Sequence, residues 1–408
     1  LYTIYKAVTA IKLADSLSRQ AGARVVPIFW LASDDHDFAE VNHVDLLDRE
    51  GQPQRISYDG RPPQERVPVG RVEFSAEIEA CVGALDEMTP PSEFKPEILS
   101  QLKDAYQPGR TFTEAFAIWS THLFRDHGLV LIDPSHPDVI AMAVEPLLTE
   151  INGGSPSSRC AMRASKRLIE EGYSPQVRQQ EGRLNLFLSE RERHPIHVSG
   201  DGFSVKDPDR GFTRAELAEV ARNTPRAFSP NVMMRPLVQD TILPTVAYVG
   251  GPGEIAYFAQ LREAYEEFGI PMPIVYPRKG FTFVERHIGS ALESLSLSIP
   301  DVWGGLSETR NALAAEEVPE PLRRALEVAA ANLDRDLESI RTEAAAMDGS
   351  LGQTADGVRR KMQHQMNLLE KKVIQAAKKN QKIQGRKLTK LENNLHPNRN
   401  LQERVLNV

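Results

Sequence analysis

The chain has 408 residues, of which 41% are hydrophobic and 26% charged, and its formal net charge is −7. Two or three domains are expected, because single cores stop growing near ~250–300 residues. The negative charge argues against a nucleic-acid partner, and no apolar run reaches the ~18–20 residues of a membrane helix. With two cysteines outside any CxxC spacing, we expect a cytoplasmic protein without structural disulfides.

The first third of the chain alternates between helical and strand patterns. Residues 1–22 place apolar side chains near one stripe, which predicts an amphipathic helix. Two apolar runs, 24–32 and 128–134, are typical of buried strands. A helix should begin at Thr111, because Glu114 stands three residues later at the spacing of a capping box.

The same alternation returns later in the chain. Residues 245–249 and 273–277 are two further apolar runs typical of strands. Between them we predict one helix, from Glu254 to Phe268, that ends at Gly269. Strands that alternate with helices at this spacing predict an α/β protein with a doubly wound parallel sheet.

Two stretches interrupt this alternation and resemble insertions into the sheet domain. Residues 51–110 are rich in proline and carry no recognisable motif. Residues 152–230 open with a linker-like run of Gly and Ser at 152–158. The short alternating runs 185–188 and 197–205 predict small antiparallel hairpins.

From about residue 321, apolar side chains recur at alternating steps of three and four, as in a coiled coil. They are Leu326, Ala329, Leu333, Leu337, Ile340, Ala344, Met347, Val358, Met362, Met366, Leu369, Val373, Ala376, Leu388, Leu391 and Leu395. We predict two long helices joined by a turn around 348–352, the first acidic and the second basic, which favours antiparallel packing. This C-terminal α-helical antiparallel coiled-coil domain is expected to form a homodimer; a basic surface for RNA is the alternative.

Functional residues are expected directly after the strands, because ligands of open parallel sheets bind beyond the carboxyl ends of the strands. The segment that follows the first predicted strand is dense in polar side chains. If Ser33 or Asp34 caps a helix there, His36, Glu40 and His43 share one face of that helix.

Three interpretations of this segment remain open. As acid/base groups, His36 or His43 would take a proton from an attacking amine, with Asp35 or Asp37 orienting the ring. As a metal site, two imidazoles and a carboxylate would hold zinc or another divalent ion. As structure, the acids would complement a helix dipole. We predict that these two histidines and two aspartates are catalytic and that no metal is stably bound.

Two further segments supply candidate binding residues. At 248–257 a strand, a glycine-rich turn and a helix follow one another, so Glu254 would hold an amine or a sugar hydroxyl, unless the turn serves packing only. Arg235, four residues before Gln239, would bind a carboxylate or phosphate, or form a structural salt bridge. The predicted substrate- or nucleotide-binding residues are Ser33, Glu40, Asn42, Arg235, Gln239, Asp240, Tyr248, Gly250, Gly251, Gly253, Glu254, Tyr257 and Arg278.

Several stretches resemble the bacillithiol biosynthesis cysteine-adding enzymes of the BshC family. They are PIFWLASDDHDFAEVNHV, GLVLIDP, NVMMRPLVQDTILPTVAYVGGPGEIAYFAQL, PMPIVYPR and HPNRNLQERVLN. The resemblance implies a Rossmann-like core with two connecting insertions, a nucleotide pocket and a coiled-coil domain used for dimerisation. It also implies condensation of the cysteine carboxyl with the glucosamine amine of glucosaminyl malate. A strand and a Gly/Gln-rich turn are expected ahead of the opening helix in such proteins.

These patterns together give an expected domain order and an expected reaction. The expected parts are a first core part at 1–150 with an insertion at 51–110, a connecting insertion at 151–230, a second core part at 231–300, and a helical coiled-coil hairpin at 301–408. Because a free carboxylate does not form an amide without activation, we expect ATP, converted to ADP or AMP, with Mg²⁺. The alternatives are a metal-dependent hydrolase or deacylase, and a nucleotide- or RNA-binding scaffold.

Overall fold

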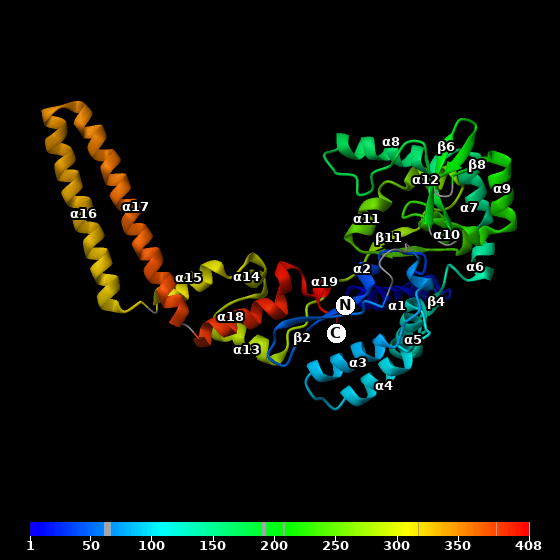
Figure 1. Ribbon diagram of the computed structural model, residues 1–408, viewed down its shortest axis with the longest axis horizontal. Helices are drawn as coiled ribbons and strands as arrows, with labels where there is room; N and C mark the ends of the chain where they lie inside the picture. The colour runs from blue at the N-terminus through cyan, green and yellow to red at the C-terminus, as the bar shows by residue number, and fades with distance from the viewer. Residues whose placement is uncertain (61–66, 190–192, 207–208, 317, 381, 408) are drawn as a thin grey trace. The chain divides into compact units, whose positions relative to one another are not determined.

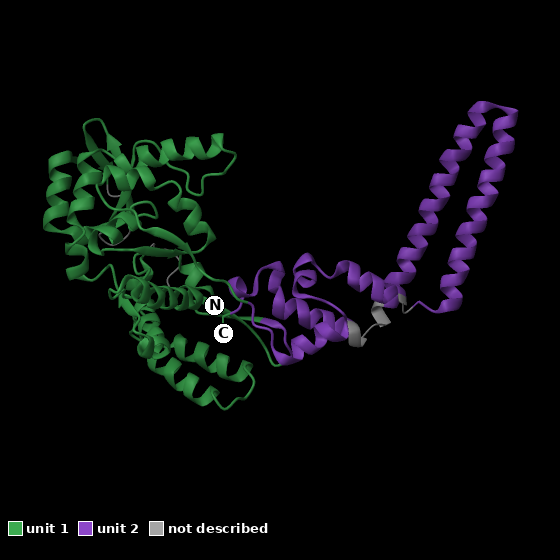
Figure 2. Ribbon diagram, turned by 180° about the vertical axis from the view of Figure 1, so that it is seen from behind, with its two compact units in different colours: residues 1–49, 54–281, 407–408 green, residues 50–53, 282–406 purple. Residues whose placement is uncertain are grey.

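The computed structural model describes residues 1–60, 67–189, 193–206, 209–316, 318–380 and 382–407 (Figure 1). The chain divides into two compact units (Figure 2). Unit 1 holds residues 1–49, 54–281 and 407–408, and unit 2 holds residues 50–53 and 282–406. Across the described ranges, no helix is both long and apolar enough to span a membrane.

Two parallel strand pairs form the Rossmann-like part of unit 1. Strand β1 (Ile28–Trp30) pairs in parallel with β4 (Val130–Ile132). Strand β10 (Ala247–Gly250) pairs in the same way with β11 (Ile274–Pro277). Parallel neighbours need long crossover connections, and here the chain runs through helices between the partners. The predicted strands and their parallel direction are confirmed.

Two helix boundaries of unit 1 follow the local sequence. Helix α1 (Tyr2–Ala21) ends at Gly22, whose φ of 63° is a left-handed conformation that glycine adopts at little cost. Helix α5 (Phe112–Phe124) begins after Thr111, whose side chain accepts a hydrogen bond from Glu114 N, while the Glu114 carboxylate accepts one from Thr111 N. Both predictions, the first helix and the capping box, are confirmed.

The remaining part of unit 1 contains a five-stranded antiparallel sheet in the order β8-β7-β6-β5-β9. Its strands are β5 (Arg183–Ser189), β6 (Arg193–Ser199), β7 (Gly202–Val205), β8 (Arg210–Thr213) and β9 (Phe228–Pro230). The hairpins predicted at 185–188 and 197–205 are confirmed. One face of this sheet is buried against a core to which helices α7 (Val144–Asn152), α8 (Pro156–Glu170), α9 (Arg214–Asn223), α10 (Arg235–Ile242) and α12 (Arg262–Glu267) contribute (Figure 1).

The run at 152–158 is not a linker, so that prediction was wrong. Ser157 lies at the start of α8 and is buried, and its hydroxyl donates to Glu150 Oε1 at 2.8 Å. Glu150 is fully buried and also accepts hydrogen bonds from Ser155 Oγ and from Asn185 N. Small polar residues stand here because a buried carboxylate needs several donors.

The helix predicted from Glu254 to Phe268 is divided into two. Helix α11 (Pro252–Phe258) ends before Gln260, and α12 begins after it. The Gln260 side chain is fully buried and forms two hydrogen bonds of 2.9 Å with the backbone of Val177. Burial of this amide against a neighbouring segment is a tertiary contact that the local pattern does not contain.

The proline-rich stretch at 51–110 packs around an aromatic cluster in which the ring centroids of Phe74 and Phe112 are 4.4 Å apart. The other elements of unit 1 are α2 (Phe38–Val41), β2 (His43–Leu47), β3 (Pro53–Ser57), η1 (Val69–Arg71), α3 (Glu77–Met88), α4 (Lys95–Ala105), η2 (Arg125–His127), α6 (Pro137–Ala141) and η3 (Pro225–Ala227).

Unit 2 has its own small core, built from residues far apart in the sequence. Leu388, Leu391 and Leu395 of α18 are fully buried and pack against α13 and α14. These leucines were predicted to continue the coiled coil, and this assignment was wrong, since their apolar face is covered by the shorter helices. The helices are α13 (Arg286–Ser294), α14 (Ile299–Gly304), α15 (Ser307–Glu316), α18 (Lys382–Leu395), η4 (Pro397–Arg399) and α19 (Gln402–Val405).

The long helices α16 (Glu320–Met347) and α17 (Gly349–Asn380) form an antiparallel hairpin with only Asp348 between them (Figure 1). Arg359 of the second helix donates to Asp334 Oδ1 at 2.8 Å and to Glu338 Oε2 at 2.6 Å on the first. Charges of opposite sign therefore meet across the hairpin, as the sequence predicts.

Candidate active site

Ser33 and Asp133 lie side by side just beyond the carboxyl ends of β1 and β4. The strand pairing continues to Leu31, whose N–H donates to Ile132 O at 2.9 Å. Two residues later, Ser33 Oγ donates to Asp133 Oδ1 at 2.5 Å. The same oxygen accepts hydrogen bonds from the backbone and the hydroxyl of Ser135, at 2.9 and 2.8 Å. The place is the one that the parallel-sheet rule predicts for a ligand site.

The short helix η1 is pressed against this point. Gly70 N donates to Ser33 O at 3.0 Å, and Val69 N donates to Asp35 O at 2.7 Å. A Cβ at position 70 would lie only 2.7 Å from Ser33 O, so no larger residue fits without displacement of the backbone. This close contact brings Arg71 into the surroundings of Asp34.

The surroundings of Asp34, next to Ser33, raise the pKa of its carboxyl. Burial raises the pKa of its carboxyl, and the charges of Asp133 and Asp35 raise it further. The guanidinium groups of Arg193 and Arg71 act in the opposite direction without cancelling the rise. A carboxyl whose pKa is raised in this way can hold or release a proton nearer to neutral pH than an ordinary aspartate does.

The predicted helical face of His36, Glu40 and His43 does not exist. Helix α2 (Phe38–Val41) has only four residues and is capped by Asp37, whose carboxylate accepts from Glu40 N at 3.3 Å. His36 lies before this helix, and His43 is the first residue of β2. The prediction was wrong because the chain leaves the helix after one turn to pair with β3.

His36 contacts Arg193 through its ring. Arg193 Nη1 lies 3.2 Å from His36 Nδ1, and because a guanidinium can only donate, Nδ1 is the acceptor and the ring proton is on Nε2. Asp35 Oδ1 accepts from the backbone of His36 at 2.7 Å and of Asp37 at 3.3 Å, and it is 3.8 Å from the ring nitrogen. The aspartate therefore shapes the turn instead of orienting the imidazole.

His43 has a separate set of partners on β2. Its Nδ1 is 3.3 Å from Asn42 Oδ1, and its Nε2 is 3.7 Å from Asp45 Oδ2. Asp45 also forms a two-point ion pair with Arg55, with both distances 2.8 Å. Asn42 donates to Tyr58 O at 3.2 Å, so its amide holds the end of α2 against the aromatic cluster.

A second set of polar residues surrounds the carboxyl ends of β10 and β11. Glu254 Oε2 accepts from Gly251 N at 2.8 Å, and Glu254 Oε1 accepts from the Tyr248 hydroxyl at 2.6 Å. Lys6 of α1 forms an ion pair with the same carboxylate at 2.5 Å. Burial alone would raise the pKa of Glu254, but the lysine and these hydrogen bonds outweigh it and leave the pKa lowered.

Arg235 lies in a hydrogen-bonded chain behind this carboxylate. It donates to the hydroxyls of Tyr248 at 2.9 Å and Tyr257 at 2.7 Å, and to Gln239 Oε1 at 3.2 Å. Gln239 in turn donates to Asp240 Oδ1 at 3.2 Å. These predicted binding residues are thus brought together, and their polar groups are directed mainly at one another.

The glycine-rich turn is lined by side chains of the protein itself. A Cβ at Gly251 would be 3.4 Å from both Arg278 Nε and Glu254 Oε2, and one at Gly250 would be 3.4 Å from Glu254 Cβ. Around Gly253 there is more space, with Gln176 Nε2 at 3.9 Å. Only the last of these glycines has open surroundings.

Tyr2 links the two sets of residues. Its hydroxyl donates to Glu40 Oε1 at 3.3 Å, and its ring lies 5.8 Å from the guanidinium carbon of Arg278. Arg278 follows β11, and its backbone N–H donates to Gly250 O at 2.9 Å. The segment after β1 and the turn after β10 are therefore neighbours within unit 1.

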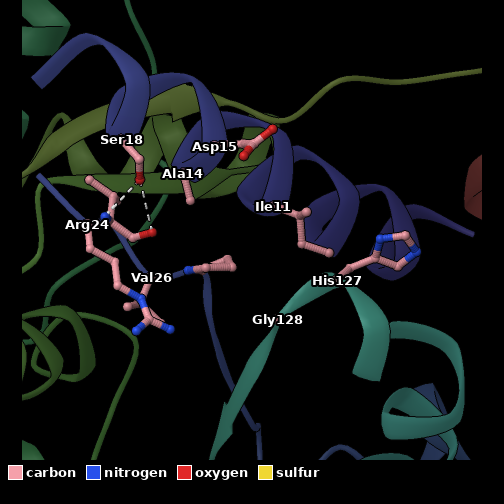
Figure 3. A pocket seen from close by; sticks show the side chains of 10 residues that line it. Ile11, Ala14, Asp15, Ser18, Arg24, Val26, His127 and Gly128 are labelled. Carbon is pink, nitrogen blue, oxygen red and sulfur yellow. Dashed lines mark hydrogen bonds between the residues drawn. The ribbon is translucent and has the colours of Figure 1, made fainter. Parts of the chain in front are cut away.

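A cavity of about 270 Å³ lies at the opposite ends of β1 and β4, where Pro27 and Gly128 enter the strands (Figure 3). Ser18, Arg24 and His127 also line it. None of the predicted site residues does. Within the described ranges, no three His, Cys, Asp or Glu side chains are grouped so that they could hold a metal ion.

The predicted site residues did not include Asp34, Asp133, Arg71 or Arg193, which the structure places beside Ser33. Asp133 could have been found, because it follows a predicted strand directly. Arg193 could not, since it belongs to a strand of the other sheet and reaches Asp34 O, at 2.9 Å, only through the tertiary fold.

Comparison with known proteins agrees with this architecture. The family model described as Bacillithiol biosynthesis BshC, N-terminal Rossmann-like domain, matches residues 1–279, and the one described as its C-terminal coiled-coil domain matches residues 281–408.

Similar curated proteins carry the name "Putative cysteine ligase BshC". The one from Salinibacter ruber is 34% identical, over 100% of this chain and 74% of the relative. Those from Symbiobacterium thermophilum and Bacillus cereus are 34% and 30% identical, over 100% of this chain and 75% and 76% of the relatives. The two family models together cover almost every residue, and the chain therefore belongs to the BshC family of bacillithiol biosynthesis.

Proposed function

We propose that this protein is a ligase that joins the carboxyl group of cysteine to the amine of glucosaminyl malate, the last step of bacillithiol biosynthesis. The observation that carries the proposal is the similarity to proteins named as cysteine ligases along the whole chain. The acid group beyond β1 and β4, which consists of Asp34, Asp35 and Asp133, supports the proposal. Amide formation requires a group that accepts a proton from the attacking amine.

In this proposal Asp34 is the first candidate for that acceptor. Its raised pKa brings its proton affinity closer to that of an amine than an ordinary carboxylate has. Arg193 and Arg71 lie close enough to stabilise the ionised form, and Asp133 is held in place by Ser33 and Ser135. Precise placement of the two reactants at such a site can supply ~7–11 kcal/mol of the barrier reduction in well-oriented cases.

His36 and His43 remain candidates with different requirements. His36 can accept a proton only at Nδ1, the atom that Arg193 contacts, so this hydrogen bond would have to open first. In its present orientation the ring offers an Nε2–H donor, which suits a substrate carboxylate. His43 lies between Asn42 and Asp45, and its Nε2 is 3.7 Å from that carboxylate.

Activation of the cysteine carboxyl is proposed to use ATP with Mg²⁺. The nucleotide would supply the leaving group. The cysteine carboxylate would attack the γ-phosphorus of ATP and release ADP, or attack the α-phosphorus and release pyrophosphate, which gives a mixed anhydride. Attack by the amine would then form the C–N bond, release phosphate or AMP, and pass the amine proton to the base. Among the predicted binding residues, Arg278 and the space around Gly253 suit phosphate best, because Lys6 already neutralises Glu254 in this turn. A carboxylate such as Asp133 is the ligand type that Mg²⁺ prefers.

We further propose that the hairpin of α16 and α17 forms a homodimer. Several of its apolar side chains remain exposed, which is unusual for a surface that stays in water. They include Val328, Ile340, Val358, Met362 and Leu369, between 42% and 57% exposed. A second copy of the hairpin would cover them with residues of the same kind.

The reaction can be tested with the purified chain, cysteine, glucosaminyl malate, ATP and Mg²⁺, followed by mass spectrometry. The expected product has the mass of both substrates minus one water, and it should form only when the nucleotide is present. A control without cysteine reports hydrolysis of the nucleotide alone. Product formation without any nucleotide would contradict the activation step, and the absence of product under all conditions would contradict the ligase assignment.

A further inference from the structure

The antiparallel sheet of unit 1 has a second face that carries positive charge. Along β5, Leu184, Leu186 and Leu188 are buried in the core, and the alternate residues Arg183 and Phe187 on the other face are half-buried. Asn185 between them is buried and donates to Ser157 and Ser158, and the pairing with β6 shifts its register between Arg183 and Phe187. A face of this kind ordinarily carries mixed charges when it only meets water.

Phe187 lies between two guanidinium groups. The guanidinium carbon of Arg193 is 4.2 Å from the centre of its ring, and that of Arg183 is 5.1 Å away. Arg183 donates to Gln180 Oε1 at 3.3 Å, and Arg193 donates to Ser229 Oγ at 2.9 Å. In the part of the chain that the structure describes, Arg183 has no ion pair with a carboxylate, whereas Arg193 interacts electrostatically with Asp34 and Asp35. Stacking on the ring fixes both guanidinium groups. Arg183 keeps donors available, whereas each nitrogen of the Arg193 guanidinium already donates to a protein group.

His197 stands directly across from Arg183 in the β5–β6 pairing, and Ser204 is its partner on β7. Burial lowers the pKa of His197, and the positive charges of Arg183 and Lys206 lower it further. An imidazole, an arginine and a lysine are thus near one another, whereas the charge of Arg193 is already partly balanced by Asp34 and Asp35. Such an arrangement costs electrostatic free energy in the free protein, and a bound anion would recover it.

This charged face is continuous with the candidate active site. Arg193 donates from Nη1 to Asp34 O at 2.9 Å, and it contacts His36 Nδ1 with the same nitrogen. A ligand group held at Arg183 and His197 would therefore belong to a molecule whose other end can reach Asp34. Asp34 and its neighbouring acids would hold one end of a substrate, and the basic face of the sheet would hold the other end.

We propose that Arg183, His197 and the Phe187 ring form a binding subsite for a doubly charged anionic group. This chemistry is shared by the malyl dicarboxylate of the proposed acceptor and by the phosphates of a nucleotide. Naming either source rests on the proposed ligase function, whereas anion binding at this face does not. Arginine matches carboxylate and phosphate oxygens in a two-point geometry, which an isolated lysine cannot provide.

The test compares Arg183→Gln and His197→Gln with a matched control, Arg210→Gln. Arg210 also stacks on a phenylalanine of this sheet, with its guanidinium carbon 4.9 Å from the Phe212 ring, but it pairs with Val205, whose side chain faces the core, and so lies on the opposite face. Calorimetric titrations with malate, glucosaminyl malate and ADP measure binding without any turnover. Loss of one charge-assisted hydrogen bond should weaken binding about tenfold to a hundredfold.

The expected result is that Arg183→Gln and His197→Gln weaken binding of one class of anion, while Arg210→Gln binds like the wild type. Weaker malate and glucosaminyl malate binding identifies the dicarboxylate, and weaker ADP binding identifies the phosphate. Equal affinity of all variants for all three ligands, or no binding of any of them by the wild type, would overturn the subsite. If anions bind as expected but no amide product forms, the subsite stands and the ligase function fails.

Discussion

Asp34 is the residue whose surroundings bear most directly on chemistry. Burial and two neighbouring carboxylates raise its pKa, so its ionised form is reached at a higher pH than in an exposed aspartate. If Asp34 accepts the amine proton, kcat/KM falls as the pH drops through this raised pKa, because protonation removes the base. Asp34→Asn should lower kcat/KM by ~10²–10⁴-fold and abolish this acidic limb.

A pH–rate profile of both proteins measures this effect. Asp138→Asn is a suitable control, since that carboxylate is exposed and lies on α6, outside the acid group. A profile of Asp34→Asn that keeps the acidic limb of the wild type would assign the proton transfer to another group. His36→Ala and His43→Ala would then be the next variants to compare.

At the scale of elements, two helices whose third residue is a glutamate that accepts from the N-cap backbone N–H allow a direct comparison. Glu114 caps α5 and is exposed, whereas Glu254 caps α11 and also binds Lys6 and Tyr248. Glu254→Gln should therefore reduce the free energy of unfolding by ~1–3 kcal/mol, because a charged hydrogen-bond acceptor is lost. Glu114→Gln should reduce the free energy of unfolding by less, about 1 kcal/mol or below.

Thermal unfolding followed by circular dichroism distinguishes the two variants. Titration with cysteine, glucosaminyl malate and ATP adds the binding measurement for Glu254→Gln. A melting temperature like that of the wild type together with weaker ligand binding would show that the carboxylate serves a ligand more than it serves the helix.

At the scale of the whole molecule, the hairpin of α16 and α17 determines the expected oligomeric state. Ile340→Lys places a charge among exposed apolar side chains, where Ile340 itself is 57% exposed. The substitution should convert a dimer to a monomer, since a charge buried without a partner costs more than the apolar contact gains. Light scattering of the full chain measures the mass.

Ile169→Lys is the matched control for this experiment. Ile169 is 62% exposed on α8 in unit 1, so the same change of side chain is made outside the hairpin. A dimer that persists in Ile340→Lys, or a wild type that is monomeric, would contradict dimerisation through the coiled coil.

The sequence by itself determined the features that depend on neighbours along the chain. The capping box at Thr111, the end of α1 at Gly22, the short strands and the long helices all follow from patterns within a few turns. Opposite charges on the two long helices also predicted their antiparallel packing, and the structure adds the contacts of Arg359 with Asp334 and Glu338. Such features are local, or repeat regularly, and need no knowledge of the rest of the fold.

Tertiary structure alone decided which polar residues meet. Arg193 reaches Asp34 across 159 positions, Gln260 divides a predicted helix by pairing with Val177, and Leu388 packs in a core that its heptad spacing did not indicate. The segment after β1 has the composition of a helix start, yet it forms a single turn because β2 and β3 pair immediately afterwards. A local pattern indicates which secondary structures a segment can form. Burial against distant segments determines which of them is formed, because the free energy of tertiary packing exceeds that of local secondary-structure propensity.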